Sequence, residues 1–132
     1  MTDDSIAARL APYMLSVLRI MAALLFLEHG LSRMLGFPSP LPAPPSFTMY
    51  WFAGGIELVG GILLTLGLVS RLSALIMSGE MAFAYFMAHF PTNHIFPYLN
   101  GGESAVLFCF VFLYLSAAGP GPLSVDRALR RA

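Results

Sequence analysis

The chain has 132 residues, of which 58% are hydrophobic and 11% charged, and its mean hydropathy is +0.76. Soluble domains carry about 25% charged residues, so this composition excludes a water-soluble globular domain and predicts an all-α integral membrane protein. Seven arginines and no lysines balance seven acids, which removes the basic footprint expected of a nucleic-acid-binding protein.

Four apolar stretches predict the membrane spans of a four-helix bundle that forms a single domain over residues 1–132. A span needs about 20 mainly apolar residues, and the stretches cover residues 13–35, 51–69, 72–90 and 103–118. Asp3 and Asp4 precede the first stretch, and no small-residue cleavage site follows it, so we interpret it as a retained helix and not as a signal peptide. Residues 4–14 are expected to lie along the membrane surface as an amphipathic lead-in.

The connections between these spans differ in character. Residues 36–46 contain five prolines, which favour an extended, polyproline-like loop. Only Ser70 and Arg71 separate the second and third stretches, so a tight helical hairpin is expected there. Residues 91–102 carry enough aromatic side chains to lie at the membrane interface.

The distribution of arginine predicts the orientation, because cytoplasmic connections are enriched in basic residues. Four spans place both termini and the hairpin on one side of the membrane. That side collects Arg9, Arg19, Arg71, Arg127, Arg130 and Arg131, with Arg19 reaching back to the interface, and the other side has Arg33. Both termini are therefore expected in the cytoplasm, in a multi-pass protein of a bacterial inner membrane.

Each span contains one glutamate, although a charged side chain at the bilayer centre costs roughly 3 kcal/mol or more. The helix rise places all four glutamates in the half of the bundle away from the cytoplasm, together with histidine, arginine and asparagine side chains. The sequence therefore predicts a pocket for a ligand or for protons, made of Glu28, His29, Arg33, Glu57, Glu80, His89, Asn100 and Glu103. Trp51, the single tryptophan, is expected at the interface end of this pocket.

Helical phase indicates which of these side chains can meet. His29 and Arg33 share a face of the first span, and Arg33 is the expected cation for the acids. Glu80 and His89 are nine residues apart and point in opposite directions, unless Pro91 unwinds the end of that helix.

Glu57 shares a helix face with Gly54, Gly60 and Gly61, small residues that allow a neighbouring helix to approach closely. The alternative to a functional pocket is a structural role, in which the acids pair with arginine or share protons to hold the helices together. Four glutamates against one arginine require protonation, pairing with charged histidine or a bound cation. A resident metal is not expected, because di-iron bundles place Glu-x-x-His pairs on two helices and this chain has none.

Short motifs follow one another in order along the predicted spans. They are Leu18-Arg19, Glu28–Arg33, Gly54–Gly61, Gly67–Arg71, Ala84–His89, Pro97–Glu103 and Gly119–Asp126. In this order they resemble the DoxX family of small four-helix membrane proteins, part of a DoxX/DoxD-like superfamily, over about residues 15–126. Arg33 stands where that family usually has lysine, and Glu80 is an acid outside the family pattern.

The resemblance implies a small membrane subunit of a redox complex, since relatives include a subunit of a thiosulfate:quinone oxidoreductase and others are linked to complexes that handle thiols and oxidative stress. A quinone head group needs hydrogen-bond donors and a proton acceptor beside an apolar slot, which the predicted pocket could supply. Cys109 is the single cysteine, so the chain has no dithiol centre of its own. No cofactor intrinsic to the chain is evident and no catalytic residue is assigned.

The expected partners are therefore the lipid bilayer, a quinone, a redox partner subunit and further copies of the chain. A related branch of the superfamily acts in the assembly of other membrane proteins. That relationship supplies the alternative: an assembly factor or chaperone, or a protein that binds lipids or small molecules without catalysis.

Overall fold

A computed structural model describes residues 5–39, 44–92 and 94–131, and every regular element in these ranges is helical. The all-α class is thus confirmed. The elements are α1 (Ile6–Leu35), α2 (Met49–Leu66), α3 (Ser70–Ala84), the π-helix η1 (Tyr85–His89), the 3₁₀-helix η2 (Phe90–Thr92), α4 (Pro97–Asn100), α5 (Glu103–Ala118) and α6 (Val125–Arg131).

Helix α1 begins seven residues earlier than the sequence predicts. The Ser5 hydroxyl caps it by accepting a hydrogen bond from the backbone N–H of Ala8 at 3.2 Å. Pro12 lies inside the helix without ending it. The separate surface lead-in expected for residues 4–14 is wrong over residues 6–14, which continue into the long helix, and residue 4 lies outside the described ranges.

The tight turn between α2 and α3 is confirmed. Gly67 ends α2 with φ 72°, a left-handed conformation that favours glycine, and α3 begins three residues later at Ser70. Helix α5 covers residues 103–118, as predicted for the fourth span. Of the proline-rich connection after α1, residues 40–43 lie outside the described ranges.

The third predicted helix changes its winding before it ends. Helix α3 stops at Ala84, and in η1 the backbone N–H of Phe90 donates to the carbonyl of Tyr85, five residues back. Pro91, which follows, has no N–H to continue an α-helical ladder. A π-turn holds more residues than an α-turn and rotates the following side chains, so Glu80 and His89 line one cavity, the case that the sequence left open if the helix end before Pro91 unwinds.

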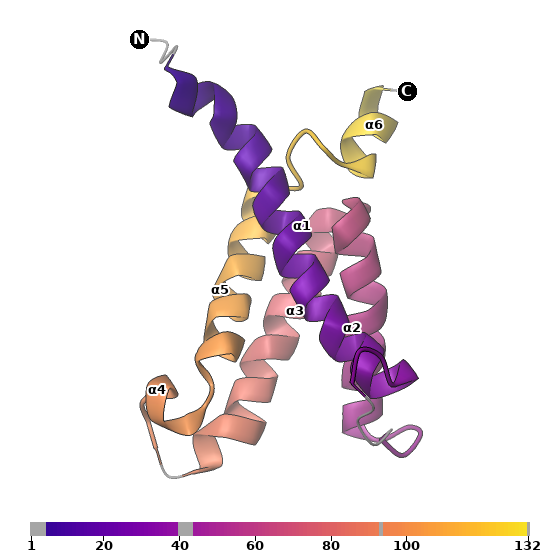
Figure 1. Ribbon diagram of the computed structural model, residues 1–132, viewed down its shortest axis with the longest axis vertical. Helices are drawn as coiled ribbons and strands as arrows, with labels where there is room; N and C mark the ends of the chain where they lie inside the picture. Colours follow the sequence, from indigo (N-terminus) through magenta and orange to yellow (C-terminus); the bar gives the residue numbers. More distant parts are fainter. Residues whose placement is uncertain (1–4, 40–43, 93, 132) are drawn as a thin grey trace.

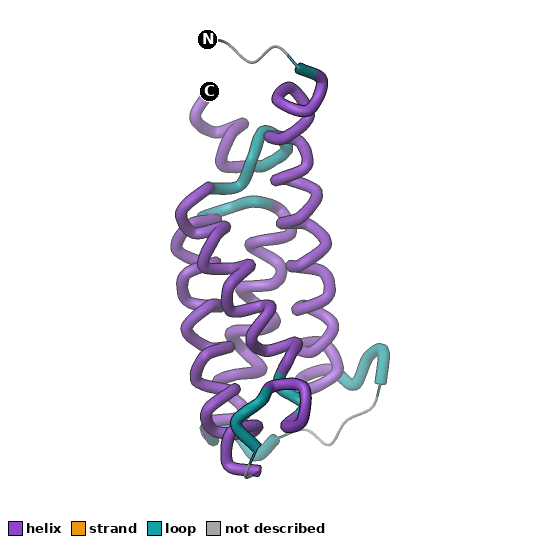
Figure 2. The backbone as a smooth tube through the Cα atoms, turned by 90° about the vertical axis from the view of Figure 1, so that its left-hand side faces the viewer, coloured by secondary structure: helices purple, strands orange, loops and turns teal. Residues whose placement is uncertain are grey.

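The long helices run side by side, and α6 lies at the same end of the molecule as the start of α1 (Figures 1 and 2). Helix α1 packs on α2, α2 on α3, and α3 on α5. The first of these contacts is close, because a Cβ added to Gly30 would lie 2.6 Å from the backbone nitrogen of Leu58. The interior is apolar, with Phe26, Leu64 and Phe112 fully buried.

The exterior is apolar as well. Helices α1 and α2 are long and apolar enough to cross a membrane, and only 28% of the most apolar window of each is buried. A core helix of a soluble protein would be mostly buried, whereas these helices present apolar side chains outward. Helix α5 is apolar but shorter, at 16 residues.

Arg19 ties together the end of the molecule near α6. It is 1% exposed and donates hydrogen bonds to the backbone carbonyls of Thr65, Pro120 and Leu123. Arg19 thus contacts carbonyls of the segment after α5 in place of water, and its approach to the membrane interface stays a prediction.

Asp126 holds the turn between α2 and α3 at the same end. Its carboxylate accepts hydrogen bonds from the backbone N–H groups of Val69 and Ser70, both at 2.9 Å, and its own N–H donates to the carbonyl of Gly67. Burial would raise the pKa of Asp126, but these hydrogen bonds outweigh burial and hold the pKa below its ordinary value.

Candidate functional site

A cavity of about 670 Å³ lies in the half of the molecule away from α6. Its walls come from α1, α2, α3, η1 and α5 and are mostly apolar. The polar and ionisable side chains that line it are His29, Arg33, Tyr50, Glu57, Glu80, His89 and Ser104. Five of the eight residues that the sequence placed in one pocket thus surround a common space.

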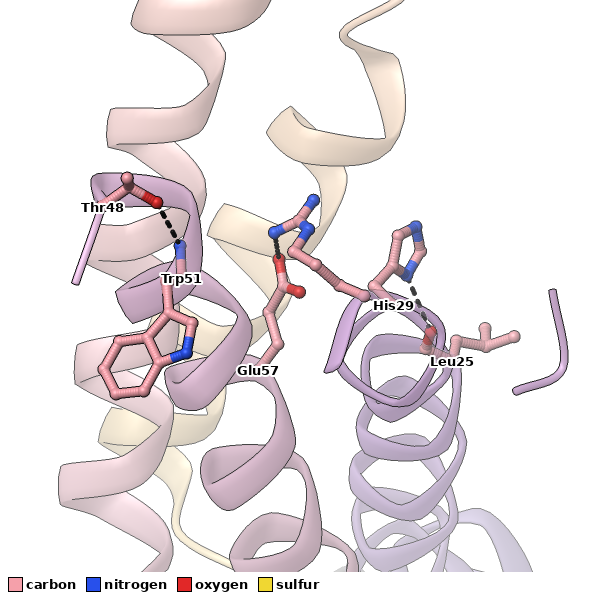
Figure 3. Close-up of polar contacts among 6 residues, drawn as sticks. Leu25, His29, Thr48, Trp51 and Glu57 are labelled. Atoms are coloured by element: carbon pink, nitrogen blue, oxygen red, sulfur yellow. Dashed lines mark hydrogen bonds and ion pairs between the residues drawn. The ribbon is translucent and has the colours of Figure 1, made fainter. Parts of the chain in front are cut away.

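Arg33 and Glu57 form an ion pair across the contact between α1 and α2, as the sequence predicts for Arg33. Arg33 Nη1 donates to Glu57 Oε1 at 3.0 Å (Figure 3). The Glu57 side chain is 4% exposed and that of Arg33 is 28% exposed. The Glu57 carboxylate is therefore almost shielded from solvent, whereas the Arg33 guanidinium stays partly accessible to solvent.

Glu80 of α3 lines the same cavity as the Arg33–Glu57 ion pair. Glu57 Oε2 and Glu80 Oε2 are buried and accept no hydrogen bond from the described residues. Two ionised carboxylates cannot hydrogen-bond to each other, but one proton on either group supplies a donor to the other. The cavity therefore places two carboxyl groups, which could share a proton, beside one guanidinium.

Two histidines complete the polar lining. His29 Nδ1 contacts the carbonyl of Leu25 in its own helix at 3.1 Å (Figure 3). The His29 ring is nearly perpendicular to the ring of Phe108, with centroids 6.5 Å apart. His89 Nδ1 contacts the carbonyl of Asn100 at 3.2 Å. The π-helix brings His89 to the same cavity as Glu80.

Asn100 supports the cavity wall and does not line the cavity. Its amide donates to Tyr85 Oη and to the carbonyl of His94, both at 3.0 Å, and its side-chain oxygen accepts from the N–H of Gly102 at 2.9 Å. These bonds fix the segment between α4 and α5. Because the carbonyl of Asn100 contacts His89, the segment also positions that ring.

Besides Asn100, three residues lie elsewhere than the sequence predicts. Glu28 is exposed and lies outside the cavity lining, one position before His29 but on another face of α1. Glu103 is exposed in the first turn of α5, where a carboxylate interacts favourably with the helix dipole. Trp51 faces away from Glu57 and lines a neighbouring cavity (Figure 3).

Sequence reasoning missed Tyr50, Ser104 and Phe108 as lining residues. Tyr50 precedes Glu57 by seven residues, a spacing that puts both on one helix face, so its position could have been inferred. Ser104 and Phe108 are likewise four residues apart on α5. Their place opposite His29 depends on how α5 packs, which the sequence pattern does not specify.

These features define a helical protein with an apolar exterior and a cavity whose ionisable groups come from α1, α2, α3 and η1. The chain belongs to the DoxX family, a membrane-associated family whose model matches residues 14–90.

The chain is also similar to individual proteins. An uncharacterized protein of Haemophilus influenzae is 43% identical over 120 residues, which cover 87% of this chain and 90% of that protein. "Putative oxidoreductase CatD" of Bacillus subtilis is 35% identical over 115 residues, which cover 83% of this chain and 82% of that protein. No solved structure matches significantly.

Proposed function

We propose that the protein is a small integral membrane subunit of a quinone-linked redox system, and that its main cavity binds the quinone head group. The observation that carries this proposal is an apolar cavity in which Arg33, Glu57, Glu80 and two histidines converge. The name of the Bacillus subtilis relative, an oxidoreductase, supports a redox role. Electrons would come from a partner subunit, and further copies of the chain are additional candidate partners.

The residues present suit a quinone head group. A bound quinone would accept electrons and protons from its redox partners. Arg33 and the histidines offer N–H donors to its carbonyl oxygens, and the Glu57–Glu80 pair can hold a proton close to them. The apolar walls of the cavity exclude water and accommodate the ring.

The proposal includes four membrane-spanning segments in a bacterial inner membrane, formed by α1, α2, α3 with its extension, and α5, and it places both termini in the cytoplasm. We expect a cysteine introduced at Ser46, after α1, to react with an impermeant maleimide added to intact cells, because six of seven arginines favour the opposite side. Ala128→Cys is the matched control on α6, and Cys109→Ala removes the native thiol. Labelling of Ala128→Cys alone in intact cells would show that the orientation is the reverse of the predicted one.

A binding titration tests the proposed ligand. Tyr50→Trp combined with Trp51→Phe places a single tryptophan in the cavity lining at a half-exposed position, where it should not disturb the core. We expect saturable quenching by a soluble short-tail quinone. Removing the His29 donor with His29→Leu should weaken binding about tenfold, the effect of one hydrogen bond to a polar ligand.

Glu28→Gln is the matched control for this titration, because Glu28 is the neighbouring residue and lies outside the cavity. It should leave quinone affinity unchanged. Absence of saturable quenching, with all variants folded, would contradict the proposal and favour an assembly factor or a non-catalytic lipid-binding protein. For an assembly factor, substitutions in the cavity should instead change the abundance of a client that co-purifies with the protein.

A further inference from the structure

A second cavity, more open and of about 380 Å³, adjoins the main cavity between α2 and α3. The two cavities share the side chains of Phe52, Ile56 and Ile76. The second cavity extends along α2 from Trp51 to Leu63, about 18 Å of helix at 1.5 Å per residue. It therefore runs along the seam between α2 and α3 directly beside the main cavity.

The two cavities differ in polarity. The ionisable side chains line the main cavity, whereas Ser73 is the one hydroxyl among the otherwise apolar residues that line the second. The outer side of the second cavity is open to the apolar exterior, since Val59 is 58% exposed. A ligand with a polar head and a long apolar tail would therefore be favoured with its head in the main cavity and its tail in the second cavity.

Neighbouring seams offer less room for a tail. Gly30 brings the backbones of α1 and α2 into contact, and Gly61 packs against Leu27 in the same seam. Helices α3 and α5 are joined by a hydrogen bond from the Ser78 hydroxyl to the carbonyl of Cys109 at 2.7 Å. The α2–α3 seam, in contrast, contains the second cavity.

We propose that the second cavity receives the isoprenoid tail of the quinone whose head group occupies the main cavity, so that the natural ligand is a long-tailed quinone that enters between α2 and α3. This inference rests on the proposed function. A tail gains little free energy by exchanging lipid for an apolar groove, so the groove acts mainly by fixing where the tail lies. The position of the groove directly beside the polar cavity favours this tail over an ordinary lipid chain, which needs no neighbouring ionisable groups.

Two glycines provide matched variants. A Cβ added at Gly55, which lines the second cavity, or at Gly79, which lines neither cavity, meets no atom within 4 Å. Leucine is also the better helix former at both positions. Gly55→Leu should thus fill the groove, and Gly79→Leu should leave it open, with both proteins folded.

The experiment uses a benzoquinone with a short isoprenoid tail that ends in a photoreactive diazirine, and the labelled positions are mapped by mass spectrometry. We expect labelling of α2 and α3 around Val59 and Met77, and competition by excess short-tail quinone. Gly55→Leu should lower this labelling about tenfold, equivalent to about 1.4 kcal/mol, without changing short-tail affinity, and Gly79→Leu should have no effect.

The other outcomes distinguish failure of the tail path from failure of the proposed function. Saturable binding of short-tail quinone, together with labelling of α5 or of α1, would overturn the tail path and leave the proposed function standing. Groove labelling that short-tail quinone does not compete would show an ordinary lipid site and would also overturn the inference. If the short-tail quinone itself does not bind, the proposed function and the tail path both fail.

Discussion

Arg19→Ala is expected to lower the free energy of unfolding by roughly 3–5 kcal/mol. The side chain is 1% exposed and donates to three backbone carbonyls, two of them in the segment that leads from α5 to α6. Alanine leaves a void and removes the Arg19 donor from the carbonyls of Thr65 and Leu123, which water reaches poorly, while the Pro120 carbonyl keeps its hydrogen bond from the Ser16 hydroxyl. Unfolding in detergent, followed by circular dichroism, measures the loss.

Arg71→Ala is the matched control for this prediction. Arg71 also donates to backbone carbonyls, those of Ser116 and Ala117, but it is exposed. Water can replace its hydrogen bonds, so the loss should stay below about 1 kcal/mol. Equal destabilisation by the two substitutions would show that Arg19 is not the buried tie that the structure describes.

The fold class and the approximate positions of the long helices could be predicted because they follow from local signals. The apolar stretches predict both ends of α5, whereas the stretch predicted to end at residue 69 corresponds to α2, which ends at Leu66 before Gly67. The π-turn after Ala84 could not be predicted in the same way, since it depends on how Pro91 and the segment held by Asn100 fit against the helix end. That turn decides which way His89 points.

The ionisable residues of the cavity could be identified from the sequence because charge is costly to place in a membrane. The helix faces on which they lie could be predicted only in part. Arg33 and Glu57 met as expected, because both lie in regular helices that approach through Gly30. Glu28 has the same chemistry as Glu57, and only the packing of α1 places it outside the cavity. Arg19 illustrates the converse: carbonyls far away in sequence bury a residue expected at the interface.

Arg33→Ala should destabilise the protein by about 3 kcal/mol, because it leaves the almost fully buried Glu57 carboxylate without its cation. This value is at the lower end for buried pairs, since the Arg33 side chain keeps 28% exposure. Arg130→Ala, at an exposed position on α6, should change stability by less than about 0.5 kcal/mol. Adding Glu57→Gln to Arg33→Ala removes the unpaired charge and should recover much of the loss.

The same Glu57→Gln substitution tests whether the carboxyl groups of Glu57 and Glu80 have a structural or a functional role. The glutamine amide can donate a hydrogen bond to Glu80 Oε2, so the single variant should remain folded. If the two side chains only hold the helices together, quinone affinity should be unchanged. We expect instead a folded protein whose short-tail quinone binding is weakened about tenfold or more, because glutamine cannot accept or release a proton beside the head group. Additive effects of Arg33→Ala and Glu57→Gln on stability would show that Arg33 and Glu57 are not coupled in the fold. Full quinone binding by Glu57→Gln would show that the Glu57 carboxyl is not part of the binding site.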